Sequence, residues 1–140
     1  MTTRLPDCLR AALLLAGLGL AASPRAAAQT QAVLTAQTCT ELRQADAELN
    51  RLYQQVLKLY AQRPTFLVPF KASQVAWLRF RDAQAEALYP ATAAGRRGSA
   101  APMCRCTTLA DLTTARNAQL KQWVEGKEEG DVCGNTIRTR

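Results

Sequence analysis

The segment TCTELRQADAELNRLYQQVLKLY, residues 38–60, decides the fold. Its apolar residues recur at alternating steps of three and four, which is the period of a helix that packs against other helices. These residues are Leu42, Ala45, Leu49, Leu52, Val56 and Leu59. Thr38 and Glu41 form a capping-box pattern that predicts the start of this helix, and Pro64 predicts its end because proline cannot continue a helix.

A second helix is predicted over residues 69–89, since proline is tolerated in a first turn and Pro90 would stop the helix. One face combines apolar and polar side chains at steps of three and four: Phe70, Gln74, Trp77, Arg81, Gln84 and Leu88. A second stripe is small and apolar: Val68, Ala72, Val75 and Ala76. A helix that is apolar on two sides favours a middle position between neighbours.

A third helix is predicted to begin at Thr108, to run to Val124 and to stop at Gly126, a residue type common at helix ends. Its expected inner face is Leu109, Leu112, Arg116, Leu120 and Trp123. Three amphipathic helices with short connections predict an all-α fold, a small antiparallel three-helix bundle in up-down-up order that is stapled by disulfides.

The N-terminus has the features of an export signal. Two arginines precede residues 11–22, an uncharged run shorter than the roughly 20 residues that span a membrane. Ala26 and Ala28 then give a small-x-small cleavage pattern. The predicted division is a signal peptide over residues 1–28 that is removed, a flexible leader over 29–37 and a single domain over 38–140. The mature protein is expected to be periplasmic or secreted, with no transmembrane segment.

Four cysteines remain after this cleavage: Cys39, Cys104, Cys106 and Cys133. In a small exported domain they predict a disulfide framework. A metal site is not expected, because the chain has no histidine and a CxC pair lacks zinc spacing. In the predicted bundle Cys39 lies near the CxC pair, and the tail can return far enough to bring Cys133 there too. We therefore expect Cys39 and Cys133 each to bond one cysteine of the pair and so pin the tail. Which of the two bonds Cys39 stays open.

Charge and composition limit the function. The chain has 18 basic and 11 acidic residues, and loss of the signal peptide would leave a net charge of +5. This favours anionic envelope partners and is too small and scattered to indicate nucleic acid. Without histidine no Ser-His-Asp or Cys-His set exists. We therefore predict no enzyme activity, no catalytic residue and no cofactor.

Three polar residues, Gln74, Arg81 and Arg116, lie on faces that should point inward. A buried guanidinium needs a partner. The expected partners are Asp46, Glu48, Asp82, Asn50 and Thr113. We interpret the set as a structural network that fixes helix register; the alternative is a binding cluster. The loop Arg96, Arg97, Gly98 and Ser99 is either a solvated turn or a projecting cationic segment that contacts an acidic partner.

The segments ADAELNRLY (45–53), SQVAWLRFRDA (73–83), GS (98–99) and LTTAR (112–116) resemble the LprI-type lysozyme inhibitors, a family of small, exported, helical bacterial proteins. The resemblance covers about residues 39–124. The matching motif residues are Asp46, Asn50, Tyr53, Gln74, Trp77, Arg81, Asp82, Thr113 and Arg116. Family members commonly have cysteines at the positions of Ala85 and Thr108, so the resemblance implies that one usual bridge is missing here.

The resemblance implies inhibition of a lysozyme or related peptidoglycan hydrolase. Such enzymes act through a carboxylate pair in a cleft, which the loop of Arg96 and Arg97 would fit. The alternative function is a non-enzymatic periplasmic module that binds cell-wall polymer, an anionic surface or a protein partner.

Overall fold

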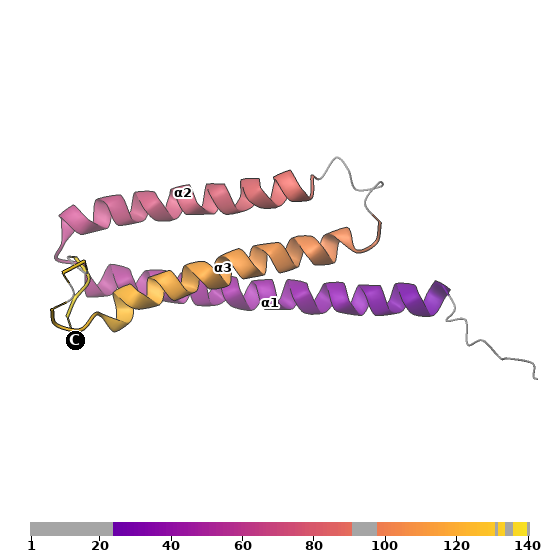
Figure 1. Ribbon diagram of the computed structural model, residues 1–140, viewed down its shortest axis with the longest axis horizontal. Helices are drawn as coiled ribbons and strands as arrows, with labels where there is room; N and C mark the ends of the chain where they lie inside the picture. The colour runs from indigo at the N-terminus through magenta and orange to yellow at the C-terminus, as the bar shows by residue number, and fades with distance from the viewer. Residues whose placement is uncertain (1–23, 91–97, 131, 134–135, 140) are drawn as a thin grey trace, which may run out of the picture.

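Three helices form the protein. The computed structural model describes residues 24–90, 98–130, 132–133 and 136–139. The helices are α1 (Pro24–Leu59), α2 (Pro64–Leu88) and α3 (Ala101–Glu125). They run in alternate directions, so that α1 and α3 point the same way and α2 the opposite way (Figure 1). The prediction of an all-α three-helix fold is confirmed, and in the described residues the only β pairing is an isolated bridge between Lys127 and Thr139.

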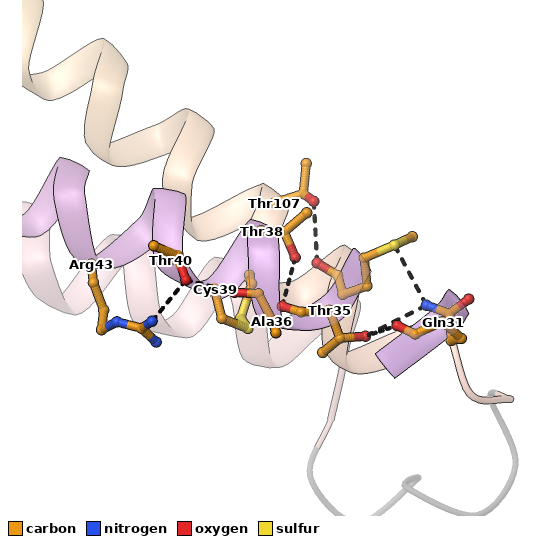
Figure 2. The surroundings of a disulfide bond; sticks show 10 residues. Gln31, Thr35, Ala36, Thr38, Cys39, Thr40, Arg43 and Thr107 are labelled. Atoms are coloured by element: carbon orange, nitrogen blue, oxygen red, sulfur yellow. Dashed lines mark hydrogen bonds between the residues drawn. A yellow bond between two sulfur atoms is a disulfide. The ribbon is translucent and has the colours of Figure 1, made fainter. Parts of the chain in front are cut away.

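Each helix begins earlier than the sequence predicted. α1 starts at Pro24 rather than Thr38, so the expected flexible leader over residues 29–37 is wrong because this segment is helical. Thr38 caps nothing: its hydroxyl donates to the Thr35 carbonyl oxygen at 3.2 Å, inside the helix (Figure 2). The preceding alanine-rich sequence has high helix propensity, so the helix continues through the threonine.

The two other helices begin earlier than predicted because a proline stands in the first turn of each. Pro64 and Pro102 stand in the first turns of α2 and α3, where a missing N–H removes no helical hydrogen bond. α2 therefore begins at Pro64 rather than Pro69, and α3 at Ala101 rather than Thr108. Pro69 lies inside α2 instead.

Helices α1 and α3 form the closest pair in the structure. Small and short side chains lie between them, including Ala45 and the fully buried Thr113. The Asn117 side-chain amide reaches across and donates to the Ala45 carbonyl oxygen at 3.0 Å. α2 keeps a greater distance and faces the pair with Phe66, Phe70, Gln74 and Ala85.

The hydrophobic core lies toward the α1–α2 turn. Its buried members are Leu49, Leu52, Val56, Tyr60, Phe66, Phe70 and Leu120. Phe66 packs between two aromatic rings, with centroid distances of 4.5 Å to Tyr60 and 4.7 Å to Trp123. Burying three or four such rings supplies a large part of the apolar area that a domain of this size can remove from water.

The predicted stripes are only partly correct. On α1, the residues from Ala45 to Val56 in the stripe are buried, but Leu59 is 48% exposed and Tyr60 takes the inward position. On α2, the expected middle position is wrong, because Val68 and Val75 of the second stripe are 71% and 49% exposed. Gln84 and Leu88 also face outward, while the neighbouring Ala85 is fully buried.

Tyr60 fastens the C-terminal tail to the core. Its hydroxyl donates to the Trp123 carbonyl oxygen at 3.2 Å and accepts from the Arg138 backbone N–H at 3.0 Å. Gly126 ends α3 with a φ of 82°, and a Cβ there would lie 2.7 Å from the Arg138 carbonyl oxygen. The described part of the tail is thus held at the end of α3 by hydrogen bonds.

One disulfide joins α1 to α3, between Cys39 and Cys106, with 5.0 Å between the Cα atoms. Figure 2 shows its surroundings, where threonines on both helices bond to carbonyls of the preceding turn. Cys104 carries no disulfide. Because the CxC pair is helical, its two side chains point about 200° apart at 100° per residue, and only one can face α1.

The predicted second bridge, between the CxC pair and Cys133, is therefore wrong. Cys104 lies in the first turn of α3 and Cys133 follows its end, so most of this helix separates them. The part from residue 104 to residue 125 is about 32 Å long at 1.5 Å per residue. The described tail folds against the end of α3 and does not run back along it.

Most of the predicted signal peptide, residues 1–23, lies outside the described residues. Among the helices of the described part, none is both long and apolar enough to cross a membrane.

The Cys39–Cys106 pairing can be tested by substituting Cys106, with substitution of the neighbouring Cys104 as the control. Cys106→Ser should lower the free energy of unfolding by about 4 kcal/mol, since the bridge closes a loop of 67 residues in the unfolded chain. Cys104→Ser should change it little. Urea unfolding of protein made in the periplasm measures both, and equal losses for the two variants would contradict the pairing.

Candidate functional site

Two arginines flank one tryptophan in the space between α2 and the α1–α3 pair. Trp77 and Arg81 lie one turn apart on α2, and Arg116 comes from α3. The guanidinium carbons are 5.4 Å and 5.8 Å from the Trp77 ring centroid. These distances allow both cations to interact with the electron-rich face of the ring.

Arg81 is fully supplied with partners. It donates to Asp46 on α1 at 2.7 Å, to the neighbouring Asp82 at 3.0 Å and to the Thr113 hydroxyl on α3 at 3.3 Å. Its side chain is only 13% exposed, whereas those of Asp46 and Asp82 are 41% and 62% exposed. Arg81 therefore ties all three helices together, with two carboxylates balancing its charge.

Arg116 has a different environment. It donates to the Gln74 amide oxygen at 3.0 Å, to the Gln119 amide oxygen at 2.8 Å and to the Ser73 hydroxyl at 3.5 Å. All three acceptors are neutral. Among the described residues no carboxylate forms an ion pair with it. Burial accordingly lowers the pKa of the Arg116 guanidinium, because the charged form loses solvent without gaining a counter-charge.

A groove opens beside Arg116 where α2, α3 and the tail meet. It has a volume of about 350 Å³. We call it the Arg116 groove and define it by its lining: Thr65, Phe66, Pro69, Phe70, Ser73, Arg116, Trp123 and Thr136. Of these described lining residues, Arg116 alone is charged. The groove thus combines aromatic walls, hydroxyl groups and one cation.

The remaining motif residues lie apart from the two arginines. Tyr53 stacks on Phe70 with 5.7 Å between ring centroids and so supports the core. Asn50 is exposed and takes no part in the hydrogen bonds of Arg81 or Arg116. Glu48 also stays out of the network and bonds the exposed Arg51 at 2.6 Å, a contact that lowers the pKa of the Glu48 carboxyl.

Sequence reasoning missed Asn117. It is 6% exposed and donates to the Ala45 carbonyl oxygen, across the packed contact between α3 and α1. Its position four residues after Thr113 places both on one helix face. That spacing was the available signal, but the expected inner face of the third helix was drawn through apolar residues and Arg116.

The predicted partner-binding loop is described only at its end. Arg96 and Arg97 lie outside the described residues. Gly98 has a φ of 73°, which side chains with a Cβ rarely adopt, and nothing lies within 4 Å of where its Cβ would be. Gly98 and Ser99 are both exposed just before α3 begins. In the described residues no group of histidines, cysteines and carboxylates is arranged to hold a metal ion.

Comparison with known proteins identifies a family to which the sequence is similar. Residues 22–120 match the family model described as Lysozyme inhibitor LprI. "Uncharacterized protein R02472" of Rhizobium meliloti (strain 1021) is 35% identical over 99 residues, covering 63% of this chain and 69% of the relative. No solved structure matches. The family match includes the disulfide and both arginines and ends at the buried Leu120, before Trp123 and the tail.

Arg81 provides the test of the polar network. Arg81→Ala should lower the free energy of unfolding by about 2 kcal/mol, because charge-assisted hydrogen bonds to two helices are lost. The loss stays moderate since the carboxylate of Asp46, at 41% exposed, can be solvated. Arg81→Lys should recover only part of the lost free energy of unfolding, because an ammonium lacks the guanidinium fork.

The matched control for this measurement is Arg51→Ala, which removes an exposed ion pair within α1 and should leave thermal and urea unfolding almost unchanged. Unfolding of Arg81→Ala that coincides with that of the parent would refute the structural role of the network.

Proposed function

Since the chain belongs to the LprI lysozyme inhibitor family, we propose that it is an exported, non-enzymatic protein that inhibits a lysozyme or a related peptidoglycan hydrolase. The family match over residues 22–120 is the observation that carries this proposal. The polar groups of the motif fit a role in the fold, because Arg81 donates to Asp46 on α1 and Thr113 on α3, and Arg116 donates to Gln74 on α2. The surface that contacts a hydrolase should then consist of residues outside that network.

We place the inhibitory surface at the disulfide end of the bundle, defined as residues 31–39 of α1 and 98–106 at the start of α3. α1 projects beyond the ends of the other helices there (Figure 1). Val33 and Leu34 are 66% and 43% exposed. A shallow hollow of about 790 Å³ lies on a different face of α1 and is lined by Gln31, Ala32, Thr35, Ala36, Cys39 and Ser99, together with Ala28, which signal-peptide cleavage would remove. Apolar and small side chains of this kind suit a protein contact.

The cationic loop supplies the charge for this contact. Arg96 and Arg97 precede Gly98, whose positive φ turns the chain into the exposed start of α3. Their guanidinium groups would form charge-assisted hydrogen bonds with the carboxylate pair of a hydrolase cleft. The Cys39–Cys106 bridge fixes the helix that follows the loop, which reduces the ordering entropy lost on binding.

A second candidate function is a non-inhibitory envelope module for an anionic wall polymer, surface or protein. The net positive charge of the chain favours it. The two functions differ in one measurement: the envelope module binds its partner and leaves hydrolase activity unchanged.

Replacement of both Arg96 and Arg97 with alanine should weaken inhibition at least about tenfold, a change of about 1.4 kcal/mol in binding. The melting temperature should stay the same, because the change removes no described core contact. Turbidity assays of wall lysis with several lysozyme types measure the inhibition.

The control is the double change Lys71→Ala with Arg79→Ala, which removes the same charge from exposed positions on α2 and should leave inhibition intact. Equal effects of the two double variants would move the surface elsewhere. Failure of the parent protein to inhibit any lysozyme or other peptidoglycan hydrolase tested would reject inhibition in favour of the envelope module.

A further inference from the structure

The Arg116 groove has a chemical character that the family match does not explain. Two of its lining residues, Trp123 and Thr136, lie beyond residue 120, where the match ends. Phe66, Phe70 and Trp123 pack together at its wall, with 5.2 Å between the two phenylalanine centroids and 4.7 Å between Phe66 and Trp123, and Phe66 and Phe70 are 8% and 5% exposed. Such walls bind an apolar body, and a few polar groups then fix its orientation.

Arg116, the one cation among the described residues that line the groove, has more N–H groups than described acceptors. A guanidinium carries five N–H groups. Three hydrogen bonds are described for Arg116, and the one to Ser73, another groove residue, is long at 3.5 Å. The Nε and Nη1 bonds to Gln74 and Gln119 hold the guanidinium in place, so that its orientation is set before any ligand arrives.

Comparison with Arg81 shows that Arg116 lacks a carboxylate partner among the described residues. Both arginines contact the same Trp77 ring, yet Arg81 has Asp46 and Asp82 beside it and Arg116 has only neutral acceptors among the described residues. Burial lowers the pKa of Arg116 for this reason. An anion in the groove would supply the counter-charge that the described residues do not.

We propose that the Arg116 groove binds a carboxylate attached to an apolar body, of the size and chemistry of the C-terminal end of a short peptide. The carboxylate would accept hydrogen bonds from Arg116, and the apolar side chain would lie against the half-buried Trp123 and the exposed edges of Phe66 and Phe70. A planar carboxylate matches one guanidinium fork. A fully polar dianion such as phosphate would leave the aromatic walls unused.

The size of the groove limits the ligand. A volume of about 350 Å³ is near the lower end of the range for small-molecule sites, roughly 300–1,000 Å³. It suits one or two residues. The proposal is independent of hydrolase inhibition, because the disulfide end and the Arg116 groove lie at different ends of α3: Cys106 is near its start and Trp123 near its end.

The test uses N-acetylphenylalanine as the probe and its neutral amide as the matched control, on the mature protein with its disulfide intact. The acid should shift the NMR signals of the Trp123 indole N–H and the Arg116 Nε–H in a saturable way. The amide should bind at least about tenfold more weakly, since only the carboxylate gains the charge-assisted bonds. Equal affinities for acid and amide, or no shift of Trp123 by the acid, would overturn the proposal.

Two variants locate the anion contact. Arg116→Lys should keep the charge but lose the fork, so the acid should bind about tenfold more weakly and approach the affinity of the amide. Arg51→Gln, a change at an exposed arginine of α1, should bind the acid as the parent does. Unchanged affinity in a folded Arg116→Lys protein would exclude Arg116 as the anion-binding residue. If that variant does not fold, the acid–amide comparison on the parent protein decides alone.

Discussion

The close packing of α1 against α3 determines where the rest of the protein lies. Asn117 reaches the Ala45 carbonyl oxygen with a short side chain, at 3.0 Å, and this contact requires the two helix backbones to approach closely. α2 presents large side chains to the pair, including Phe70 and Trp77, and stays farther away. The space that results is filled by aromatic rings at one end and by arginines in the middle, and the groove lies where this filling is incomplete.

The sequence was a good guide to this arrangement wherever a helix buries one apolar stripe. From Ala45 to Val56 the spacing alone identifies the buried residues of α1. The spacing predicts the wrong residue at Leu59, because Tyr60 is buried in its place. The Tyr60 hydroxyl bonds Trp123 and Arg138, and these contacts with distant residues are not visible in the local sequence pattern. It also fails at Thr38, since a threonine hydroxyl bonds a carbonyl within a helix as readily as it caps one.

The candidate site was predictable in its members but not in its charge balance. Helix faces bring Arg81 to Asp46 and Thr113, and the sequence predicted these partners. That Arg116 meets only neutral acceptors among the described residues depends on the distance between helices, which spacing along the chain does not contain. The same holds for the cysteines: with the third helix predicted to begin only at Thr108, both members of the CxC pair are able to bond, whereas the helical phase that the structure gives this segment selects Cys106.

The two arginines that contact Trp77 have different electrostatic environments and therefore different roles. A guanidinium removed from water loses solvation, and nearby carboxylates offset the loss. Arg81 has that compensation within the protein, so its charge contributes to joining the helices. Arg116 has amide and hydroxyl oxygens and one ring face, which orient a cation but neutralise none of its charge. In the complex that we propose, the carboxylate of the ligand would supply the counter-charge that the described residues around Arg116 do not, and the amide oxygens that orient the guanidinium would keep it directed at that carboxylate.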